Sequence, residues 1–296
     1  MFIDSVDAEM TGHNPASTPK GICFTDVEYQ EFRLFLLQAC GIDLGVGKEY
    51  LVATRVRRIL AQEHISSVTK LLVLLRNPSE RALRQEVVDA MTTNETLWFR
   101  DSYPFEYARN TLFPALVDEG VQNIRVWCAA CSSGQEPYSL NMTLNEFNRN
   151  RRGKLPLTSR IIATDISSEI LASARAGLYD RLSIARGLSQ ERLQGFFSSA
   201  ADGRWQIKPI IQQGIEFKPL NLQSDSYGFE KYHIVFCRNV LIYFNAELKK
   251  RILRNIHSVL APNAILFLGA SESVSGAEDL FDVVNCKPGI AFRKKP

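Results

Sequence analysis

The sequence predicts an α/β protein with a mainly parallel, doubly wound sheet that follows a small all-helical domain. Three observations predict this fold class. From Thr25 onward, apolar residues first recur at helical spacing. Later in the chain, short runs rich in β-branched residues alternate with helical spans, as buried parallel strands do. The last two of these runs lie close together, which favours a terminal antiparallel hairpin.

The N-terminal part predicts helices only. Residues 1–21 are polar and rich in Gly and Pro, and we expect a disordered leader that can be removed without loss of the fold. Residues 22–90 contain four groups of apolar residues at helical spacing, which begin at Tyr29, Leu51, Val68 and Leu83. We therefore expect a helical domain over 22–90, and a linker over 91–104 that contributes to the active site.

The remaining residues, 105–296, predict the sheet. The alternation breaks between about 182 and 214, where a helix-like stretch at 189–197, a turn and a short strand at 205–207 predict a small antiparallel β insertion. Elsewhere the strand candidates are 124–128, 160–164, 215–219, 233–237, 264–269, 281–285 and 290–293.

One stretch is typical of a strand, a tight turn and a helix N-terminus: Arg125-Val-Trp-Cys-Ala-Ala-Cys-Ser-Ser-Gly-Gln-Glu-Pro-Tyr-Ser139. Because Ala129, Ala130 and Gly134 have little or no side chain, a ligand can approach the backbone and the N–H groups of the next helix. Ile161-Ile-Ala-Thr-Asp165 then puts a carboxylate at the end of a second strand. The turn of small residues and the carboxylate together indicate a nucleotide-type cofactor whose ribose hydroxyls donate to Asp165.

The spacing narrows the choice of cofactor. The turn lacks both the Gly-x-Gly-x-x-Gly of dinucleotide binders and the Gly-x-x-x-x-Gly-Lys of phosphate-binding loops. An adenosine cofactor without a pyrophosphate fits better, and S-adenosylmethionine is the commonest of these. Cys128 and Cys131 lack a second pair at zinc-site spacing, so we predict no metal.

Composition excludes several other classes of protein. The chain has 296 residues, of which 45% are hydrophobic, and a net charge of +3, which is too small to indicate a nucleic-acid binder. No apolar run reaches the roughly 20 residues of a membrane span. The first residues lack the pattern of a signal peptide, and six scattered cysteines suit a reducing compartment. We expect a cytoplasmic enzyme or adaptor.

A second motif, His233-Ile-Val-Phe-Cys-Arg-Asn-Val-Leu-Ile-Tyr-Phe244, ends a buried strand in Arg238 and Asn239. Ligands of open α/β folds bind at the carboxyl edge of the sheet, where these side chains are delivered. Tyr243 follows about one turn later, so its hydroxyl can reach the same crevice. Alternatively, Asn239 caps a helix and Tyr243 packs beneath it.

Together these motifs resemble the chemotaxis receptor methyltransferases, the CheR family, over about 24–294. The matching segments, in the family's order, are 93–100 (TNETLWFR), 133–139 (SGQEPYS), 163–165 (ATD), 219–222 (PLNL) and 236–244 (FCRNVLIYF). The resemblance implies a class I S-adenosylmethionine-dependent methyltransferase fold and a cytoplasmic enzyme recruited to receptor arrays. It also implies the reaction, which is methylation of glutamate side chains on bacterial chemoreceptors.

The resemblance also implies roles for individual residues. Asn94, Thr96 and Arg100 would line the cofactor pocket and the active-site mouth, and Glu136 would lie against the cofactor. Asp165 would hold the ribose. Asn221 and Leu222 would flank the adenine. Arg238 and Asn239 would close the pocket near the sulfonium end. Arg100 and Tyr243 would lie nearest the transferred methyl group.

The same resemblance concerns substrate recognition. Arg55, Arg57 and Arg58 lie on a helix that in the family faces the acidic helical bundle of the receptor, so they would dock the substrate. Members that tether to a receptor tail peptide carry a glycine-rich loop in the inserted subdomain. The corresponding 197–205 segment (FSSAADGRW) is shorter and poorer in glycine, which argues against tethering.

Other readings remain open. A similar enzyme could serve a surface or biofilm signalling pathway instead of swimming. An amino-methyltransferase of nucleic acids would carry an Asn/Asp-Pro-Pro-Tyr/Phe element where this chain has 239–243, but the prolines are missing. A cofactor-sensing adaptor would have kept the fold and lost turnover. We expect the protein to act as a monomer.

Overall fold

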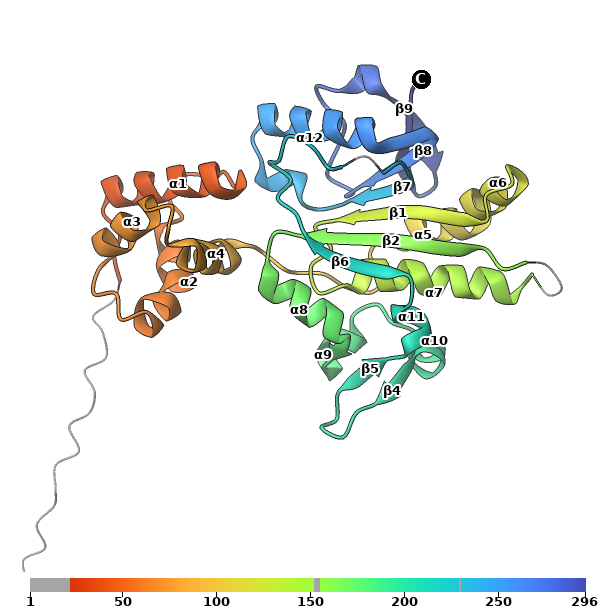
Figure 1. Ribbon diagram of the computed structural model, residues 1–296, viewed down its shortest axis with the longest axis horizontal. Helices are drawn as coiled ribbons and strands as arrows, with labels where there is room; N and C mark the ends of the chain where they lie inside the picture. Colours follow the sequence, from red (N-terminus) through yellow and green to blue (C-terminus); the bar gives the residue numbers. More distant parts are fainter. Residues whose placement is uncertain (1–21, 152–154, 229) are drawn as a thin grey trace, which may run out of the picture.

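The computed structural model describes residues 22–151, 155–228 and 230–296 (Figure 1). The leader expected over 1–21 lies outside the described residues. Four helices form the N-terminal domain, and a mixed sheet with flanking helices forms the rest. In Figure 1 the helical domain lies at the carboxyl ends of three strands, β1 (Asn123–Ala129), β2 (Thr158–Asp165) and β7 (Tyr232–Cys237), and the site is found there.

The helical domain has a core of its own. Its helices are α1 (Asp26–Cys40), α2 (Glu49–Gln62), α3 (Val68–Arg76) and α4 (Arg81–Met91). α1 begins with a capping box, in which Thr25 accepts from the Glu28 amide and Glu28 accepts from the Thr25 amide. The apolar faces of the four helices meet, and they bury Phe32, Leu36, Val56, Leu71 and Val87. This confirms the helical periodicity predicted for this region.

The large sheet has the strand order β6-β2-β1-β7-β8-β10-β9. The pairs from β6 to β8 are parallel, and β10 runs antiparallel to both β8 and β9, so the predicted terminal hairpin is confirmed. The strands are β1 (Asn123–Ala129), β2 (Thr158–Asp165), β6 (Ile215–Pro219), β7 (Tyr232–Cys237), β8 (Leu260–Leu268), β9 (Phe281–Cys286) and β10 (Gly289–Lys294).

Alternate residues of each central strand enter separate cores on the two faces of the sheet. In β1, Val126 and Cys128 face one core, and Trp127 and Ala129 face the other. α12 (Ala246–Val259) covers the second face. The other helical segments of this part are α5 (Tyr103–Tyr107), the π-helix η1 (Ala108–Leu112), α6 (Phe113–Asp118), α7 (Gln135–Arg149), α8 (Ser168–Ala176), the 3-10 helix η2 (Leu241–Tyr243) and the 3-10 helix η3 (Glu278–Leu280).

The inserted subdomain contains a three-stranded antiparallel sheet in the order β3-β5-β4. It begins at Leu178, before the predicted start near 182, because the two-residue strand β3 is too short to show a periodicity. Its elements are β3 (Leu178–Tyr179), α9 (Arg181–Ala185), α10 (Gln190–Phe196), β4 (Phe197–Ser199), β5 (Trp205–Ile207) and α11 (Pro209–Gln212).

This subdomain packs on the linker between the two domains. The fully buried ring of Trp98 lies 4.9 Å from the ring centroid of Tyr179 and 5.3 Å from that of Phe197. The Trp98 amide donates to the Arg186 carbonyl at 3.0 Å. The inserted sheet therefore holds the linker from one side.

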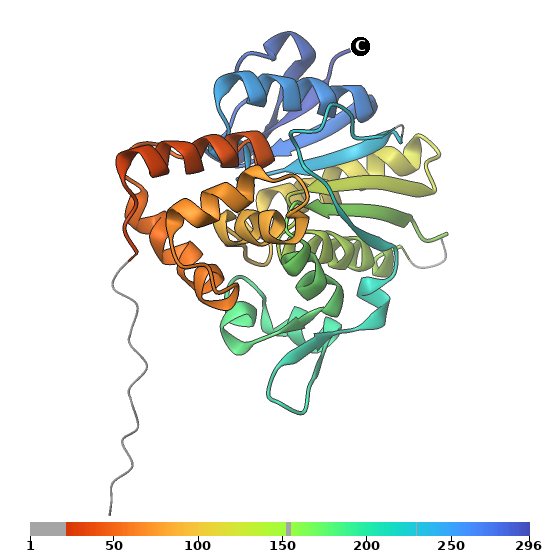
Figure 2. The same ribbon diagram turned by 60° about the vertical axis from the view of Figure 1, so that its left-hand side comes forward.

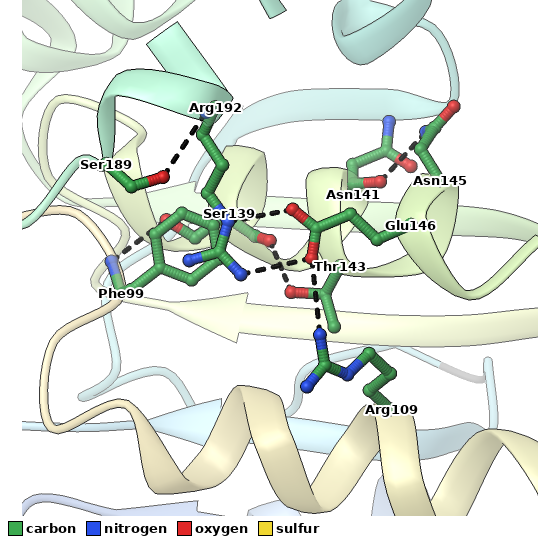
Figure 3. A network of polar contacts seen from close by, with 9 residues as sticks. All are labelled: Phe99, Arg109, Ser139, Asn141, Thr143, Asn145, Glu146, Ser189 and Arg192. Carbon is green, nitrogen blue, oxygen red and sulfur yellow. Dashed lines mark hydrogen bonds and ion pairs between the residues drawn. The ribbon is translucent and has the colours of Figure 1, made fainter. Parts of the chain in front are cut away.

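A polar network extends this attachment (Figure 3). Arg192 of α10 donates to both carboxylate oxygens of Glu146 on α7, at 2.8 and 3.0 Å. Its guanidinium also lies 3.6 Å from the ring centroid of Phe99, whose amide donates to Ser139 Oγ. Phe99 immediately precedes Arg100, so this network fixes the backbone that carries that residue.

The two domains are also in contact at the C-terminal end of α1. Both views bring this end of α1 next to the start of α12 (Figure 2). The side-chain amide of Asn221 donates to the Ala39 carbonyl at 2.9 Å, and the Asp43 amide donates to the Tyr243 carbonyl at 3.0 Å.

In the part of the chain that the structure describes, no helix has the length and apolar character needed to cross a bilayer.

Candidate cofactor and methyl-transfer site

A cleft of about 1010 Å³, its open mouth included, lies where β1, β2 and β7 end and the helical domain begins. The linker forms one wall and the loops after the strands form the others. The expected site residues that line it are Asn94, Thr96, Arg100, Glu136, Asp165, Asn221, Leu222, Arg238, Asn239 and Tyr243. Segments far apart in the sequence are thus brought to one place.

The turn after β1 joins three of the expected motifs. Its residues Ala130 and Ser132 have positive φ angles of 54° and 50°. This backbone turns the Ser132 amide toward Asp165, whose Oδ2 accepts from it at 2.9 Å. Ser132 Oγ donates to the Asn94 carbonyl at 2.9 Å. The turn, the end of β2 and the linker are therefore held together by one small residue.

Two residues expected at the cofactor lie beside the cleft instead of on its wall. Ala129 is still within β1 and is buried in the core under α12. Gly134 is the N-cap of α7 with φ +92°, and an added Cβ would lie 3.1 Å from the Tyr138 ring and 3.2 Å from Ala174. The need for glycine there comes from packing and backbone conformation. The small residues on the wall are Ala130, Cys131 and Ser132.

Asp165 is buried at the end of β2 and is suited to holding hydroxyl groups. Burial raises the pKa of its carboxyl group, and the amides of Ser167 and Ser132, which donate to the two oxygens, act in the opposite direction. Each carboxylate oxygen has two lone pairs, so both can still accept from a ribose.

Arg238 lines the cleft, but its guanidinium is already paired. The side chain is 1% exposed and donates to Glu136 at 3.0 Å, to the Arg100 carbonyl at 2.9 Å and to the Asp101 carboxylate. Burial raises the pKa of Glu136, and the charge of Arg238 opposes this. Arg238 thus connects the end of β7 to the start of α7 and to the loop that carries Arg100.

Asn239 offers an unused hydrogen-bond acceptor. Its Oδ1 is buried, and no described residue donates to it. Its backbone is left-handed, with φ +59°. Together with the carboxylates of Glu136 and Asp165, it makes the wall rich in acceptors. Such a wall fits a ligand with two ribose hydroxyls, an ammonium group and a sulfonium, as S-adenosylmethionine has.

Arg100 follows a stretch of unusual backbone. Phe99, Asp101 and Ser102 have positive φ angles of 49°, 63° and 47°. Conformations of this kind persist only where the surroundings enforce them. Two sets of contacts hold this backbone in place. The Arg192 guanidinium lies over the Phe99 ring. Arg238 donates to the Arg100 carbonyl and to the Asp101 carboxylate. Tyr243 lines the same cleft from η2.

The three arginines of α2 do not share one environment. Arg57 and Arg58 are exposed. The Arg55 guanidinium instead donates to the carbonyls of Met91 and Thr92, at 2.8 and 3.0 Å, and to the Thr93 hydroxyl at 3.2 Å. It therefore anchors the start of the linker.

Several groups at the site have no clear signal in the sequence. Cys40 and Ile42 line the cleft from the end of α1, and only the packing of the two domains brings them there. Asp101 pairs with Arg238 across 137 positions of sequence. In the sequence, only the position of Asp101 directly after the matched segment 93–100 indicates that it belongs to the site.

Sequence comparisons identify the family of this chain. The profile described as "CheR methyltransferase, SAM binding domain" matches residues 94–290, and that described as "CheR methyltransferase, all-alpha domain" matches residues 27–92. The chain is 48% identical to the chemotaxis protein methyltransferase Cher2 of Pseudomonas putida over 271 residues, which are 91% of this chain and 98% of the relative.

Two further relatives are similar over nearly their whole length. Chemotaxis protein methyltransferase 1 of Pseudomonas aeruginosa is 48% identical over 91% of this chain and 98% of the relative. Chemotaxis protein methyltransferase 1 of Vibrio cholerae is 46% identical over 93% of this chain and 99% of the relative. The chain belongs to the CheR methyltransferase family, and its cofactor is S-adenosylmethionine.

Proposed function

We propose that this protein transfers the methyl group of S-adenosylmethionine to glutamate side chains of bacterial chemoreceptors, giving glutamyl methyl esters and S-adenosylhomocysteine for sensory adaptation. One observation carries the proposal beyond family membership. Arg100 and Tyr243, a cation and a phenol able to orient a carboxylate, line the same cleft as the acceptors Asp165 and Asn239. Cofactor and carboxylate can therefore meet there.

We propose that the chain's own residues act by orientation. Bound S-adenosylmethionine supplies an electrophilic methyl group, which a carboxylate oxygen takes while the S–CH₃ bonding pair returns to sulfur. A glutamate with an ordinary pKa near 4.3 is already ionised at neutral pH, so no general base is needed. Holding the reactants in line can supply about 7–11 kcal/mol.

Arg100 and Tyr243 would each give the acceptor carboxylate one hydrogen bond. A tight ion pair with Arg100 would hold the carboxylate in its ground state and weaken as its charge is lost, so a single orienting bond serves the reaction better. Asn94, Thr96, Asn221 and Leu222 would hold the adenosine part of the cofactor, with Asp165 on the ribose and Glu136 and Asn239 toward the cationic end.

The proposed partner is the acidic helical bundle of a receptor in the cytoplasm. Arg57 and Arg58 are exposed on the domain that borders the cleft, and their positive charge would steer and dock such a surface. Because the inserted sheet packs on Trp98 and lacks a glycine-rich loop, we propose recognition of the bundle by a monomer without tethering to a tail peptide.

The test is methylation with methyl-labelled S-adenosylmethionine and membranes that contain the receptors of the same organism. Label on a receptor that mild base releases as methanol would establish a glutamyl ester. Base-stable label would indicate nitrogen methylation and overturn the proposal. Cofactor binding without labelling of any receptor would instead favour a sensing adaptor. An Asp165→Asn variant serves as the control for cofactor-dependent labelling.

A further inference from the structure

A tight turn after β8 contains a carboxylate with an unusual set of partners. Glu272 donates its own amide to the Gly269 carbonyl at 2.9 Å, which closes the turn. Its Oε2 accepts from the amides of Gly269 and Asn239, both at 2.7 Å. Its Oε1 accepts from the Ile242 amide at 3.3 Å. One side chain therefore receives three backbone N–H groups from two loops.

Two of these N–H groups belong to the 239–243 segment, which lines the cleft and is proposed to lie near the sulfonium of the cofactor. Asn239 has a left-handed backbone, and Ile242 lies within η2, one residue before Tyr243. Neither the end of a strand nor a single 3-10 turn provides regular partners for such amides. Hydrogen bonds to an ionised acceptor are about twice as strong as neutral ones, so the Glu272 carboxylate is well suited to fix this segment.

The space for this carboxylate depends on Gly269. A Cβ at that position would lie 2.7 Å from Glu272 Oε2 and 2.9 Å from the Asn239 amide nitrogen. Real Cβ atoms do not approach other atoms so closely, so the contact requires a residue without a side chain. The loops after β7 and β8 are thus built to meet at this one carboxylate.

We propose that Glu272 is a positioning residue for methyl transfer. Its carboxylate binds the backbone of the 239–243 segment so that the side-chain amide of Asn239 and the hydroxyl of Tyr243 face the cleft. Glu272 does not itself line the cofactor cleft, so it acts through these two residues. The inference rests on the proposed function, because it concerns the residues nearest the transferred methyl group.

The test uses Glu272→Gln, with Glu278→Gln as the matched control. Glu278 is an exposed carboxylate after the same strand and also accepts a backbone amide, that of Gly276 at 3.0 Å. Both oxygens of Glu272 accept in the wild type, and a glutamine has one acceptor oxygen. We expect Glu272→Gln to lower kcat about 10- to 100-fold, with less than a twofold change in the receptor KM. The control should change neither.

Amide hydrogen exchange provides a readout that does not depend on activity. The amides of Asn239 and Ile242 should exchange faster in Glu272→Gln than in the wild type, and those of β1 should not. Glu272→Asp keeps the charge but is one methylene shorter, and it should fall between the two. If Glu272→Gln does not fold, Glu272→Asp serves alone, and wild-type exchange in that variant would overturn the inference.

A double-mutant cycle identifies the residue through which Glu272 acts. If it positions Tyr243, the losses in kcat from Glu272→Gln and Tyr243→Phe should be less than additive. Additive losses with unchanged exchange at Asn239 and Ile242 would refute the inference. Failure of the wild-type enzyme to label any receptor would refute the proposed function instead, and the exchange data would still decide whether the carboxylate holds the loop.

Discussion

The two sides of the cleft are built differently. On the sheet side the Arg238 side chain is 1% exposed and pairs with Glu136, whose side chain is 13% exposed; it also pairs with the more exposed Asp101 of the linker. On the helical side the lining is Cys40, Ile42 and Met91, and the α2 cations Arg57 and Arg58, which would meet a receptor, are exposed. Buried charges can be matched to one fixed ligand, whereas exposed charges act at a distance and are screened by salt. From this difference we expect that mutations can change cofactor binding and substrate recognition separately.

The largest expected effect comes from breaking the buried charges of the sheet side. Arg238→Gln would leave Glu136 without its cation and release the loop at Arg100 and Asp101. We expect it to lower the free energy of unfolding by about 3–5 kcal/mol, because buried charges are left uncompensated. Chemical denaturation measures this change.

A surface variant provides the control for Arg238. Arg160 makes salt bridges with Glu216 and Glu230, and all three side chains are substantially exposed. Arg160→Gln should therefore cost at most about 1 kcal/mol. Equal losses for the two variants would contradict the contrast between buried and exposed charge.

The next effect separates backbone conformation from hydrogen bonding at Asn239. Asn239→Gly accepts the left-handed backbone freely but loses Oδ1, whereas Asn239→Ala loses Oδ1 and also strains the backbone by about 1–2 kcal/mol. Calorimetric titration with S-adenosylmethionine should show about tenfold weaker binding for both variants. Thermal unfolding should show a loss of stability for the alanine variant only. Wild-type affinity of the glycine variant would rule out the proposed role of Oδ1.

On the helical side we expect a change in substrate recognition alone. Arg57→Glu combined with Arg58→Glu should raise the receptor KM about tenfold at low salt, and the difference should shrink as salt is added. Cofactor affinity should stay as in the wild type. Arg254→Glu, which reverses an exposed charge on α12, is the matched control and should leave the receptor KM unchanged. A parallel loss of cofactor affinity in the double variant would show that the two sides are not separable.

The smallest effect concerns the opposite end of β7. Burial lowers the pKa of His233, whose Nδ1 accepts from the Arg125 amide at 2.9 Å. The unfolded chain therefore binds more protons than the folded protein as the pH falls below about 6.5, so this histidine's contribution to stability is lost toward acid. The Tm of the wild type should fall more between pH 7.5 and 5.5 than that of His233→Gln. Cofactor affinity at pH 7.5 should be the same for both.

Much of the fold could be predicted because its signals are local. The seven strands of the large sheet lie where buried β-branched runs predicted them, and the turn between Ala129 and Gln135 has the small residues that its backbone needs. The strand ends also placed Asp165, Arg238 and Asn239 at one edge of the sheet. Parallel strands bring their carboxyl ends together whatever the details of the loops.

The missed features depend on contacts between distant segments. Glu272 accepts from Asn239 across 33 positions, and an isolated glutamate in a loop gives no sign of this. Arg55 is on the basic helix face that predicted docking, yet its guanidinium reaches the linker 36 to 38 positions away. Periodicity tells which face of a helix is buried, but it does not tell which neighbour a long polar side chain will reach.

The cleft is enclosed by both domains, with Cys40 and Ile42 on one side and Asp165 and Asn239 on the other. A ligand bound there contacts both, so its binding free energy also opposes separation of the domains. By thermodynamic reciprocity, any interaction that favours separation of the helical domain lowers the affinity for the cofactor to the same extent that the cofactor opposes that separation. Proteolytic cleavage of the linker, residues 91–104, should therefore slow as cofactor is added. A receptor that bound the helical domain and displaced it would change the affinity for the cofactor.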